Sequence, residues 1–185
     1  FESSFGPALA ISNFASEELR NHVLPKICSG EINDAVSMSE PQAGSTLTYL
    51  TTYAHIEKDH FVINGQKRWC SGAGHADGYV VYCRLSDEPG SKGIGAVYIE
   101  KETNGFTFGK REHHMGFRGV HSADMYFDNV RISKSNIIVP AGGFKKLMEA
   151  FDLERCGNST MSLACAQSSY DYVLNYVQER KQFGK

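Results

Sequence analysis

Residues 37–45 of the chain read Ser-Met-Ser-Glu-Pro-Gln-Ala-Gly-Ser, and residues 64–71 read Asn-Gly-Gln-Lys-Arg-Trp-Cys-Ser. The first stretch predicts a loop of small residues whose backbone N–H groups can approach a phosphate or the polar edge of a ring. In the second, the Asn-Gly pair is typical of a two-residue hairpin, because both residues tolerate positive φ. We expect that hairpin to deliver an indole and a hydroxyl to the end of a strand.

Short β-branched or alternating runs occupy most of the chain between about residues 33 and 140. Turn residues separate these runs. Many short strands at this spacing predict a small antiparallel barrel or sandwich. The predicted strands are Leu47–Ile56, His60–Ile63, Lys67–Cys70, Gly78–Arg84, Gly95–Glu100, Thr107–Lys110 and Met125–Phe127, and the turns are Asn64-Gly65, Pro89-Gly90, Asn104-Gly105 and Asp128-Asn129.

Apolar residues recur at helical spacing on both sides of this region. From Pro7 onward the pattern predicts two short helices that end near Ser29-Gly30, with the Ser16 hydroxyl capping the second one. After Gly142 the helical spacing returns, and no proline interrupts residues 143–185. This last segment therefore predicts one long helix or two collinear ones.

Composition excludes several classes of protein. The 185 residues are 41% hydrophobic and 22% charged, which is ordinary for a globular protein, and the net charge of -2 gives no footprint for nucleic acid or an anionic membrane. No run approaches the roughly 18 apolar residues of a membrane span. The five cysteines are scattered, which favours buried thiols in a reducing compartment. His113, His114 and His121 lack the spacing of metal ligands, so we predict no metal site.

The two opening stretches, in this order, resemble the flavin-binding segments of the acyl-CoA dehydrogenase family, whose patterns are [ST]-E-P-x-A-G-S and N-G-x-K-x-[WY]-x-[ST]. Residues 179–184 (ERKQFG) resemble the family's E-R-x-x-F-G, and residues 115–119 (MGFRG) its M-G-x-R-[GS]. The resemblance implies an α+β fold in which a small antiparallel β-barrel middle domain is flanked by helices. Residues 1–32 would end an N-terminal helical domain, 33–140 form the middle domain, and 141–185 begin a C-terminal helical domain.

Both ends of the chain fall in mid-pattern, which predicts an internal piece of a longer polypeptide. The resemblance implies FAD as the cofactor. The loop amides would hold its pyrophosphate, Trp69 would lie against the ring and Ser71 would bond its N5 edge. Arg180 and Phe183, three apart and expected on one helix face, would reach FAD across the interfaces of a homotetramer. The implied FAD-contacting residues are Val36, Met38, Ser39, Gly44, Ser45, Trp69, Cys70, Ser71, Arg180 and Phe183.

The residues themselves leave other interpretations open. The loop could be an ordinary Glu-Pro turn, and Trp69 could belong to the core of the barrel with Ser71 as a strand-end hydroxyl. Cys70 reads as a strand filler rather than a nucleophile. The basic residues near 180 could simply favour the helix macrodipole at its C-terminus.

For the substrate, the resemblance implies that Ser45, Ser91, Asp152 and Arg155 contact acyl-CoA, although Ser91 aligns only with a gap. Glu154 fills the position of the catalytic base in one branch of the family. Alternatively, Glu154 is an ordinary charged residue on a helix. The catalytic base would then lie in a region beyond this chain. The implied activity is α,β-dehydrogenation of an acyl-CoA thioester.

Electrons would pass to an electron-transfer flavoprotein, in the cytoplasm of a bacterium or the mitochondrial matrix of a eukaryote. Alternative functions are an oxidase, monooxygenase or desulfinase of the same fold. A catalytically incomplete fragment that serves as a structural or binding module is a further alternative.

Overall fold

The computed structural model describes residues 5–185. Residues 1–4, the start of the predicted N-terminal helical segment, lie outside the described residues. The chain divides into two compact units, of which the first ends at Phe151 and the second runs from Asp152 to Lys185. Each unit is described by itself below. The boundaries predicted at residues 32/33 and 140/141 remain a prediction.

Two short helices begin the described chain, as the sequence predicts. Helix α1 spans Phe5–Phe14 and α2 spans Glu17–Ser29. The Ser16 hydroxyl accepts a hydrogen bond from the N–H of Leu19 at 3.2 Å, so it caps α2 by satisfying a first-turn donor. Gly30 ends the helix in the left-handed region, at a φ of 74°. The cap and the stop therefore both confirm the prediction.

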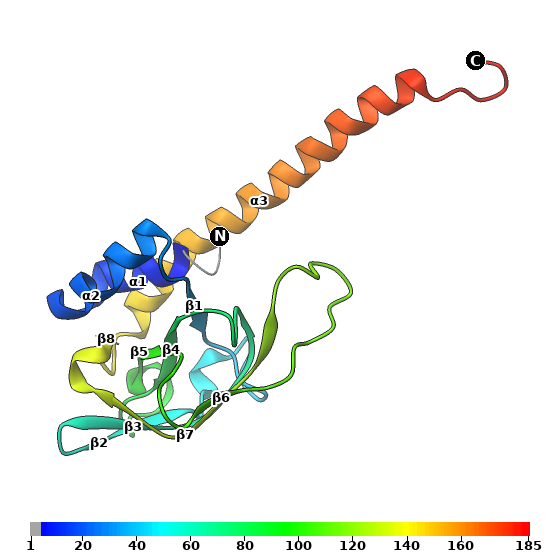
Figure 1. The fold of residues 1–185 in the computed structure, drawn as a ribbon. Helices are drawn as coiled ribbons and strands as arrows, with labels where there is room; N and C mark the ends of the chain where they lie inside the picture. The colour runs from blue at the N-terminus through cyan, green and yellow to red at the C-terminus, as the bar shows by residue number, and fades with distance from the viewer. Residues whose placement is uncertain (1–4) are drawn as a thin grey trace. The chain divides into compact units, whose positions relative to one another are not determined.

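One sheet of eight strands forms the body of the first unit within residues 5–151 (Figure 1). Its order is β6-β7-β3-β2-β4-β5-β8, and β1 pairs with β4 off this path. The strands are β1 Asp34–Ser37, β2 Tyr53–Glu57, β3 His60–Ser71, β4 Gly78–Arg84, β5 Ile94–Glu100, β6 Phe106–Phe108, β7 Ser122–Ser133 and β8 Ile137–Val139. Three short 3₁₀ turns join them: η1 Leu47–Tyr49, η2 Gly90–Gly93 and η3 Lys134–Asn136.

The α+β class is confirmed, but the closed antiparallel barrel is wrong. The sheet is mixed, because β1 and β2 both pair with β4 in parallel, and the second of these pairings is the single pair Tyr53↔Arg84. In the described residues the end strands β6 and β8 do not pair, so the sheet stays open. Alternation in a sequence reports which face a side chain occupies and carries no information on the direction of the neighbouring strand.

The predicted hairpin at Asn64-Gly65 is also wrong. β3 runs unbroken through this pair, and a shift in its register with β7 occurs there. The tight turn between β2 and β3 lies earlier, where Lys58 has a φ of 55°. On the facing strand the N–H of Asn129 donates to Oδ1 of Asn64 at 3.0 Å. Because Ile63 pairs with Val130 and Gly65 pairs with Phe127, Asp128 and Asn129 of β7 together face Asn64. The Asn-Gly pair therefore lies in a continuous strand, and the extra residue of the β-bulge is on β7.

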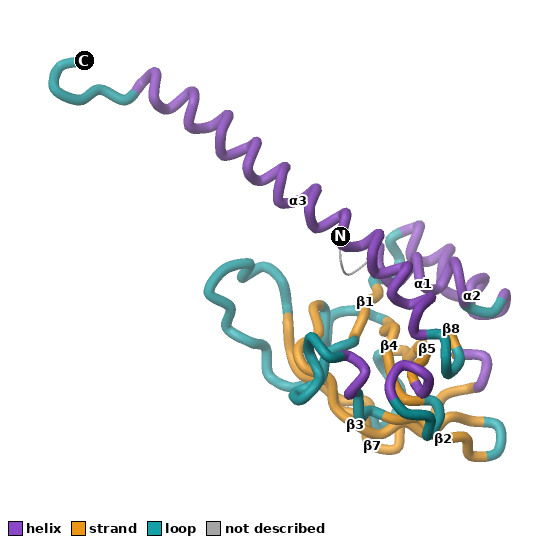
Figure 2. Tube along the Cα trace, turned by 180° about the vertical axis from the view of Figure 1, so that it is seen from behind, coloured by secondary structure: helices purple, strands orange, loops and turns teal. Residues whose placement is uncertain are grey.

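Two hydrophobic clusters lie on the two sides of β4, whose residues 78–83 are all buried. One cluster joins alternate residues of β4 to β3, β5 and β7. The other joins the remaining β4 residues to α1, α2, β8 and the buried Leu147. Figure 2 shows α1 and α2 together on one side of the sheet. A strand buried on both faces explains why β4 is a continuous apolar run that was predicted with its observed bounds.

Helix α3 spans Phe144–Glu179, which selects one long helix from the two predicted alternatives. It begins in the first unit and continues through the second. Side chains from residue 159 to residue 185 are exposed. None of the helices within residues 5–185 combines the length and hydropathy needed to cross a bilayer.

Candidate functional site

The loop that follows β1 is a tight turn with an open outer edge. The N–H of Glu40 donates to the carbonyl of Ala43 at 2.9 Å, and the N–H of Ala43 donates back at 3.1 Å. Within the described residues, the N–H groups of Gly44 and Ser45 have no acceptor, and both residues are exposed. A Cβ added at Gly44 would meet no protein atom within 4 Å. Two adjacent donors beside open space suit the approach of an anion.

The end of β3 presents an aromatic ring to solvent. Trp69 is 60% exposed, so its predicted alternative as a core residue is wrong. Its indole N–H donates to Oε1 of Glu112 at 3.1 Å, and the guanidinium of Arg68 lies 5.5 Å from the ring centroid. Nε of Arg68 in turn donates to Oδ1 of Asp124 at 2.7 Å. These contacts hold the exposed ring in place, and such a ring is suited to stacking against a flat ligand.

The residues next to Trp69 differ in accessibility. Ser71 is half-buried and pairs with Ser122 on β7. Cys70 is 1% exposed, and burial raises the pKa of its thiol to about 12. A ligand could therefore reach Cys70 through its backbone only, which fits its interpretation as a strand filler.

The structure brings the two sequence stretches together. The N–H of Arg68 donates to the carbonyl of Ser39 at 2.9 Å, and Nζ of Lys67 donates to the carbonyl of Met38 at 2.8 Å. The Cys70 thiol lies 3.4 Å from the carbonyl of Val36. The loop and the end of β3 thus form one surface, although 19 or more residues separate them in the sequence.

Beneath this surface lies a buried ion pair that the sequence analysis missed. Nζ of Lys67 is 2.9 Å from Oε1 of Glu40, and neither side chain is exposed to solvent. Burial alone would raise the pKa of Glu40, but the Lys67 ammonium and hydrogen bonds from Thr51 and Thr52 lower it to about 2. The available signal was that an acid and a lysine each occupy a position of one of the two sequence stretches.

The remaining predicted residues lie elsewhere. Ser91 lies in η2 and is exposed. In the second unit, Asp152 and Arg155 are exposed on α3, and Glu154 is 8% exposed. Because α3 ends at Glu179, the expectation that Arg180 and Phe183 share a helix face is wrong. Arg180 directly follows the helix, and Phe183 lies in a turn further on, with a φ of 52°. Phe183 and Gly184 both have positive φ, so the chain turns away from helical geometry.

Of the three histidines considered for metal binding, His121 has a ring contact with His75, at 4.2 Å between centroids. Within the described residues no group of His, Cys, Asp or Glu could hold a metal ion.

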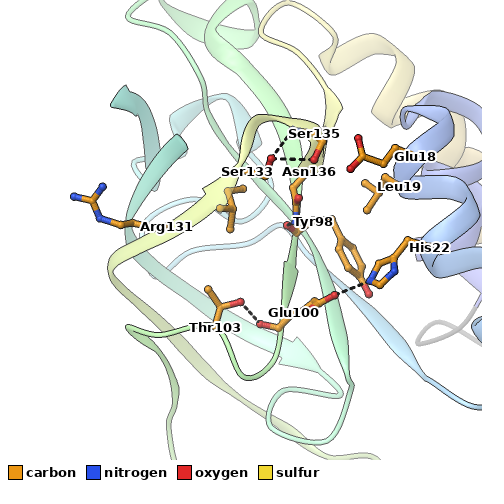
Figure 3. Close-up of a pocket in the computed structure, with 11 residues that line it drawn as sticks. Glu18, Leu19, His22, Tyr98, Glu100, Thr103, Arg131, Ser133, Ser135 and Asn136 are labelled. Carbon is orange, nitrogen blue, oxygen red and sulfur yellow. Dashed lines mark hydrogen bonds and ion pairs between the residues drawn. The ribbon is translucent and has the colours of Figure 1, made fainter. Parts of the chain in front are cut away.

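A cavity of about 280 Å³ lies between α2 and the strands β5 and β7 (Figure 3). Its walls are polar, and Nε2 of His22 lies 3.0 Å from Oε1 of Glu100 at its edge. None of the residues predicted to contact FAD or acyl-CoA lines this cavity. The candidate site is therefore the open surface formed by the loop and β3.

Comparison with known families assigns both parts of the chain. Residues 35–130 match the family model described as acyl-CoA dehydrogenase, middle domain, and residues 141–185 match acyl-CoA dehydrogenase, C-terminal domain. The chain belongs to the acyl-CoA dehydrogenase family.

Similar curated proteins of this family carry out different reactions. The chain is 32% identical to 3-sulfinopropanoyl-CoA desulfinase from Cupriavidus necator, over 100% of this chain and 48% of that protein. It is 37% identical to cyclohex-1-ene-1-carbonyl-CoA dehydrogenase from Geobacter metallireducens, over 96% of this chain and 47% of that protein. The chain thus spans about half the length of these relatives.

Solved structures share the fold. Butyryl-CoA dehydrogenase from Megasphaera elsdenii superimposes with a TM-score of 0.95 at 28% identity, over 100% of this chain and 49% of that one. The β-sheet and its flanking helices are therefore those of the family.

Proposed function

We propose that this chain is the flavin- and acyl-CoA-binding part of an FAD-dependent acyl-CoA dehydrogenase. The observation that carries the proposal is one surface formed by the loop and β3. On it lie the exposed ring of Trp69 and the N–H groups of Gly44 and Ser45, which have no acceptor in the part of the chain that the structure describes. An anion-binding edge beside an aromatic platform fits a cofactor that combines a pyrophosphate with a flat ring.

The residues present fit FAD. Gly44 and Ser45 would bind its pyrophosphate, and Met38 and Ser39 would line the pyrimidine edge of the ring. Trp69 would stack on the ring, and Ser71 would donate to its N5 edge. Val36 and Cys70 would contribute backbone contacts, while Arg180 and Phe183 would serve the FAD of another subunit. FAD supplies, when bound, an acceptor for the hydride that leaves the β-carbon of the substrate.

The chain's own residues would supply the base and the substrate contacts. Glu154 would remove the α-proton of the acyl group, so that the α,β double bond forms as the β-hydrogen leaves. Asp152 and Arg155 would contact the CoA portion together with Ser45 and Ser91. We propose a homotetramer that passes electrons to an electron-transfer flavoprotein, in a bacterial cytoplasm or a mitochondrial matrix.

A desulfinase is the second candidate. The specific observation in its favour is the 32% identity to a 3-sulfinopropanoyl-CoA desulfinase over 100% of the chain. Such an enzyme would use the same CoA contacts but would release the sulfinate group from its substrate. The two candidates therefore differ in whether an acyl-CoA reduces the bound flavin.

Anaerobic titration of the intact protein with straight, branched and aromatic acyl-CoAs tests the proposal. We expect at least one of them to bleach the flavin absorbance of the wild type. Glu154→Gln should retain FAD and lose bleaching by roughly a hundredfold or more, which is the usual scale of general-base catalysis. Glu149→Gln is the matched control, because it removes an exposed carboxylate from the same helix.

The outcomes separate the candidates. Bleaching that survives Glu154→Gln would place the base outside this chain. A flavin that no acyl-CoA reduces would contradict the dehydrogenase, and sulfite release from 3-sulfinopropanoyl-CoA would then establish the desulfinase.

A further inference from the structure

We propose that the buried Glu40–Lys67 pair is a positioning device that fixes the loop against β3 in the arrangement that binds FAD. The inference rests on the proposed function and deepens it. Neither residue touches the surface of the site, since both side chains are fully buried. They act through the backbone of the loop, so they are positioning residues.

Glu40 is the point where three segments meet. Its Oε2 accepts from the N–H of Thr51 at 2.7 Å and from Nε2 of Gln42 at 2.7 Å. Its Oε1 accepts from the N–H of Thr52 at 3.0 Å and from Nζ of Lys67 at 2.9 Å. One carboxylate thus ties the loop to the segment entering β2 and to β3. A carboxylate with donors on both oxygens is held in one orientation.

Lys67 connects the buried pair to the backbone of the loop. Besides Glu40, its Nζ donates to the carbonyl of Met38, two residues before the turn begins at Glu40. The N–H of Arg68 makes a second bond from this part of β3, to the carbonyl of Ser39. Without the ammonium, the peptide group of Met38 would lose its buried donor, and the loop would keep a single backbone tie to the strand.

A structural role alone predicts a different result from a positioning role. Removal of one partner leaves an uncompensated buried charge and destabilises the fold, whereas removal of both relieves that charge. The Met38 carbonyl lacks its donor in either case. Stability should therefore recover in the double variant, while FAD binding should not.

The test uses the intact protein as wild type, Lys67→Met and Lys67→Met/Glu40→Gln. The control is Arg131→Met, which removes an exposed ion pair with Glu57 on the same sheet. The measurements are the urea midpoint of the FAD-free protein, the FAD dissociation constant from flavin fluorescence, and the visible circular dichroism of bound FAD. Affinities are measured where circular dichroism shows that each variant is folded.

We expect Lys67→Met to lower the urea midpoint and to weaken FAD binding about tenfold or more, as expected for the loss of a hydrogen bond from a charged donor. The double variant should regain most of the midpoint but keep the weak binding and an altered flavin dichroism. The double variant tests the positioning role even if Lys67→Met alone does not fold. Arg131→Met should change none of the three measurements.

The inference is overturned if the double variant regains wild-type FAD affinity, or if Lys67→Met binds FAD as the wild type does. A wild type that binds no FAD would overturn the proposed function and the inference together. The two failures are therefore distinguishable by the wild-type titration.

Discussion

At the scale of single residues, Asp34 is a carboxylate in an unfavourable position. Its side chain is fully buried, and Oδ2 has no hydrogen-bond partner within the described residues. Oδ1 accepts from the Tyr98 hydroxyl at 3.2 Å. Burial raises the pKa of Asp34 to about 6, against the opposing effect of the Tyr98 hydrogen bond. The folded protein therefore binds a proton here more tightly than the unfolded chain does.

The sign of the pH dependence follows from this difference. Between pH 4 and pH 6 the folded state holds more protons at Asp34, so this residue makes stability fall as pH rises. The range from 3.8 to about 6 corresponds to about 3 kcal/mol of unfolding free energy. Asp34→Asn should flatten the slope in urea unfolding between pH 4.5 and pH 6.5. Asp59→Asn, in an exposed turn, should leave the slope unchanged, and an unchanged slope in Asp34→Asn would contradict the prediction.

Glu40 has the opposite effect on the pH dependence of stability, and its effect falls in a lower pH range. Its pKa of about 2 lies below the ordinary value of 4.5, so its contribution is present above pH 4.5 and is lost as pH falls toward 2. Measurements above pH 4.5 therefore separate the effect of Asp34 from that of Glu40.

At the scale of elements, the close approach of β3 to Thr52 depends on one glycine. Gly65 has a φ of 146°, and an added Cβ would lie 2.5 Å from Oγ1 and 2.7 Å from Cα of Thr52. The second contact is with backbone, so a rotamer change cannot relieve it. We expect Gly65→Ala to destabilise the protein by about 2 kcal/mol, the usual scale of overpacking. Gly116→Ala is the control, since a Cβ there meets nothing within 4 Å. Equal urea midpoints for the two variants would refute this account.

The same part of β3 shows what the sequence could predict. Propensity identifies Asn64-Gly65 as a candidate turn, but only the pairing of β3 with β7 shows that the strand continues through this pair, opposite a bulge on β7. β4 and the capped helix α2 were predictable, because a long apolar run and the Ser16 cap are local signals. The short strands β1 and β8 have too few residues to show a period, so they were missed.

In the candidate site, too, the residues with a local signal were predictable and those that depend on distant contacts were not. Trp69 and the small residues of the loop were predictable, since each has a recognisable chemistry at its own position. The Glu40–Lys67 pair was missed because a charged residue in a sequence normally indicates solvent, and its burial depends on contacts across 27 positions. Whether the sheet is open or closed depends on the order of its strands. That order cannot be read from the sequence of any single segment.

At the scale of the whole molecule, the second unit carries an apolar face that the chain itself leaves exposed. Leu163, Tyr170, Leu174 and Val177 follow intervals of seven, four and three residues, so they share one side of α3. Their exposed fractions run from 44% for Leu174 to 69% for Leu163. Burying one such side chain contributes about 1.5–3 kcal/mol, so we expect this face to be covered in the intact protein, for which we propose a homotetramer.

A charge on this face distinguishes cover by other subunits from cover within the same chain. Leu174→Lys should reduce the mass measured by light scattering from four chains to a smaller species, because a buried lysine without a partner opposes association. Ser169→Lys is the control, since it places the same charge on another side of the helix. A lower thermal midpoint at an unchanged mass would show that the face is covered within one chain. Unchanged mass and midpoint together would contradict the prediction, because a face that tolerates a lysine is not covered at all.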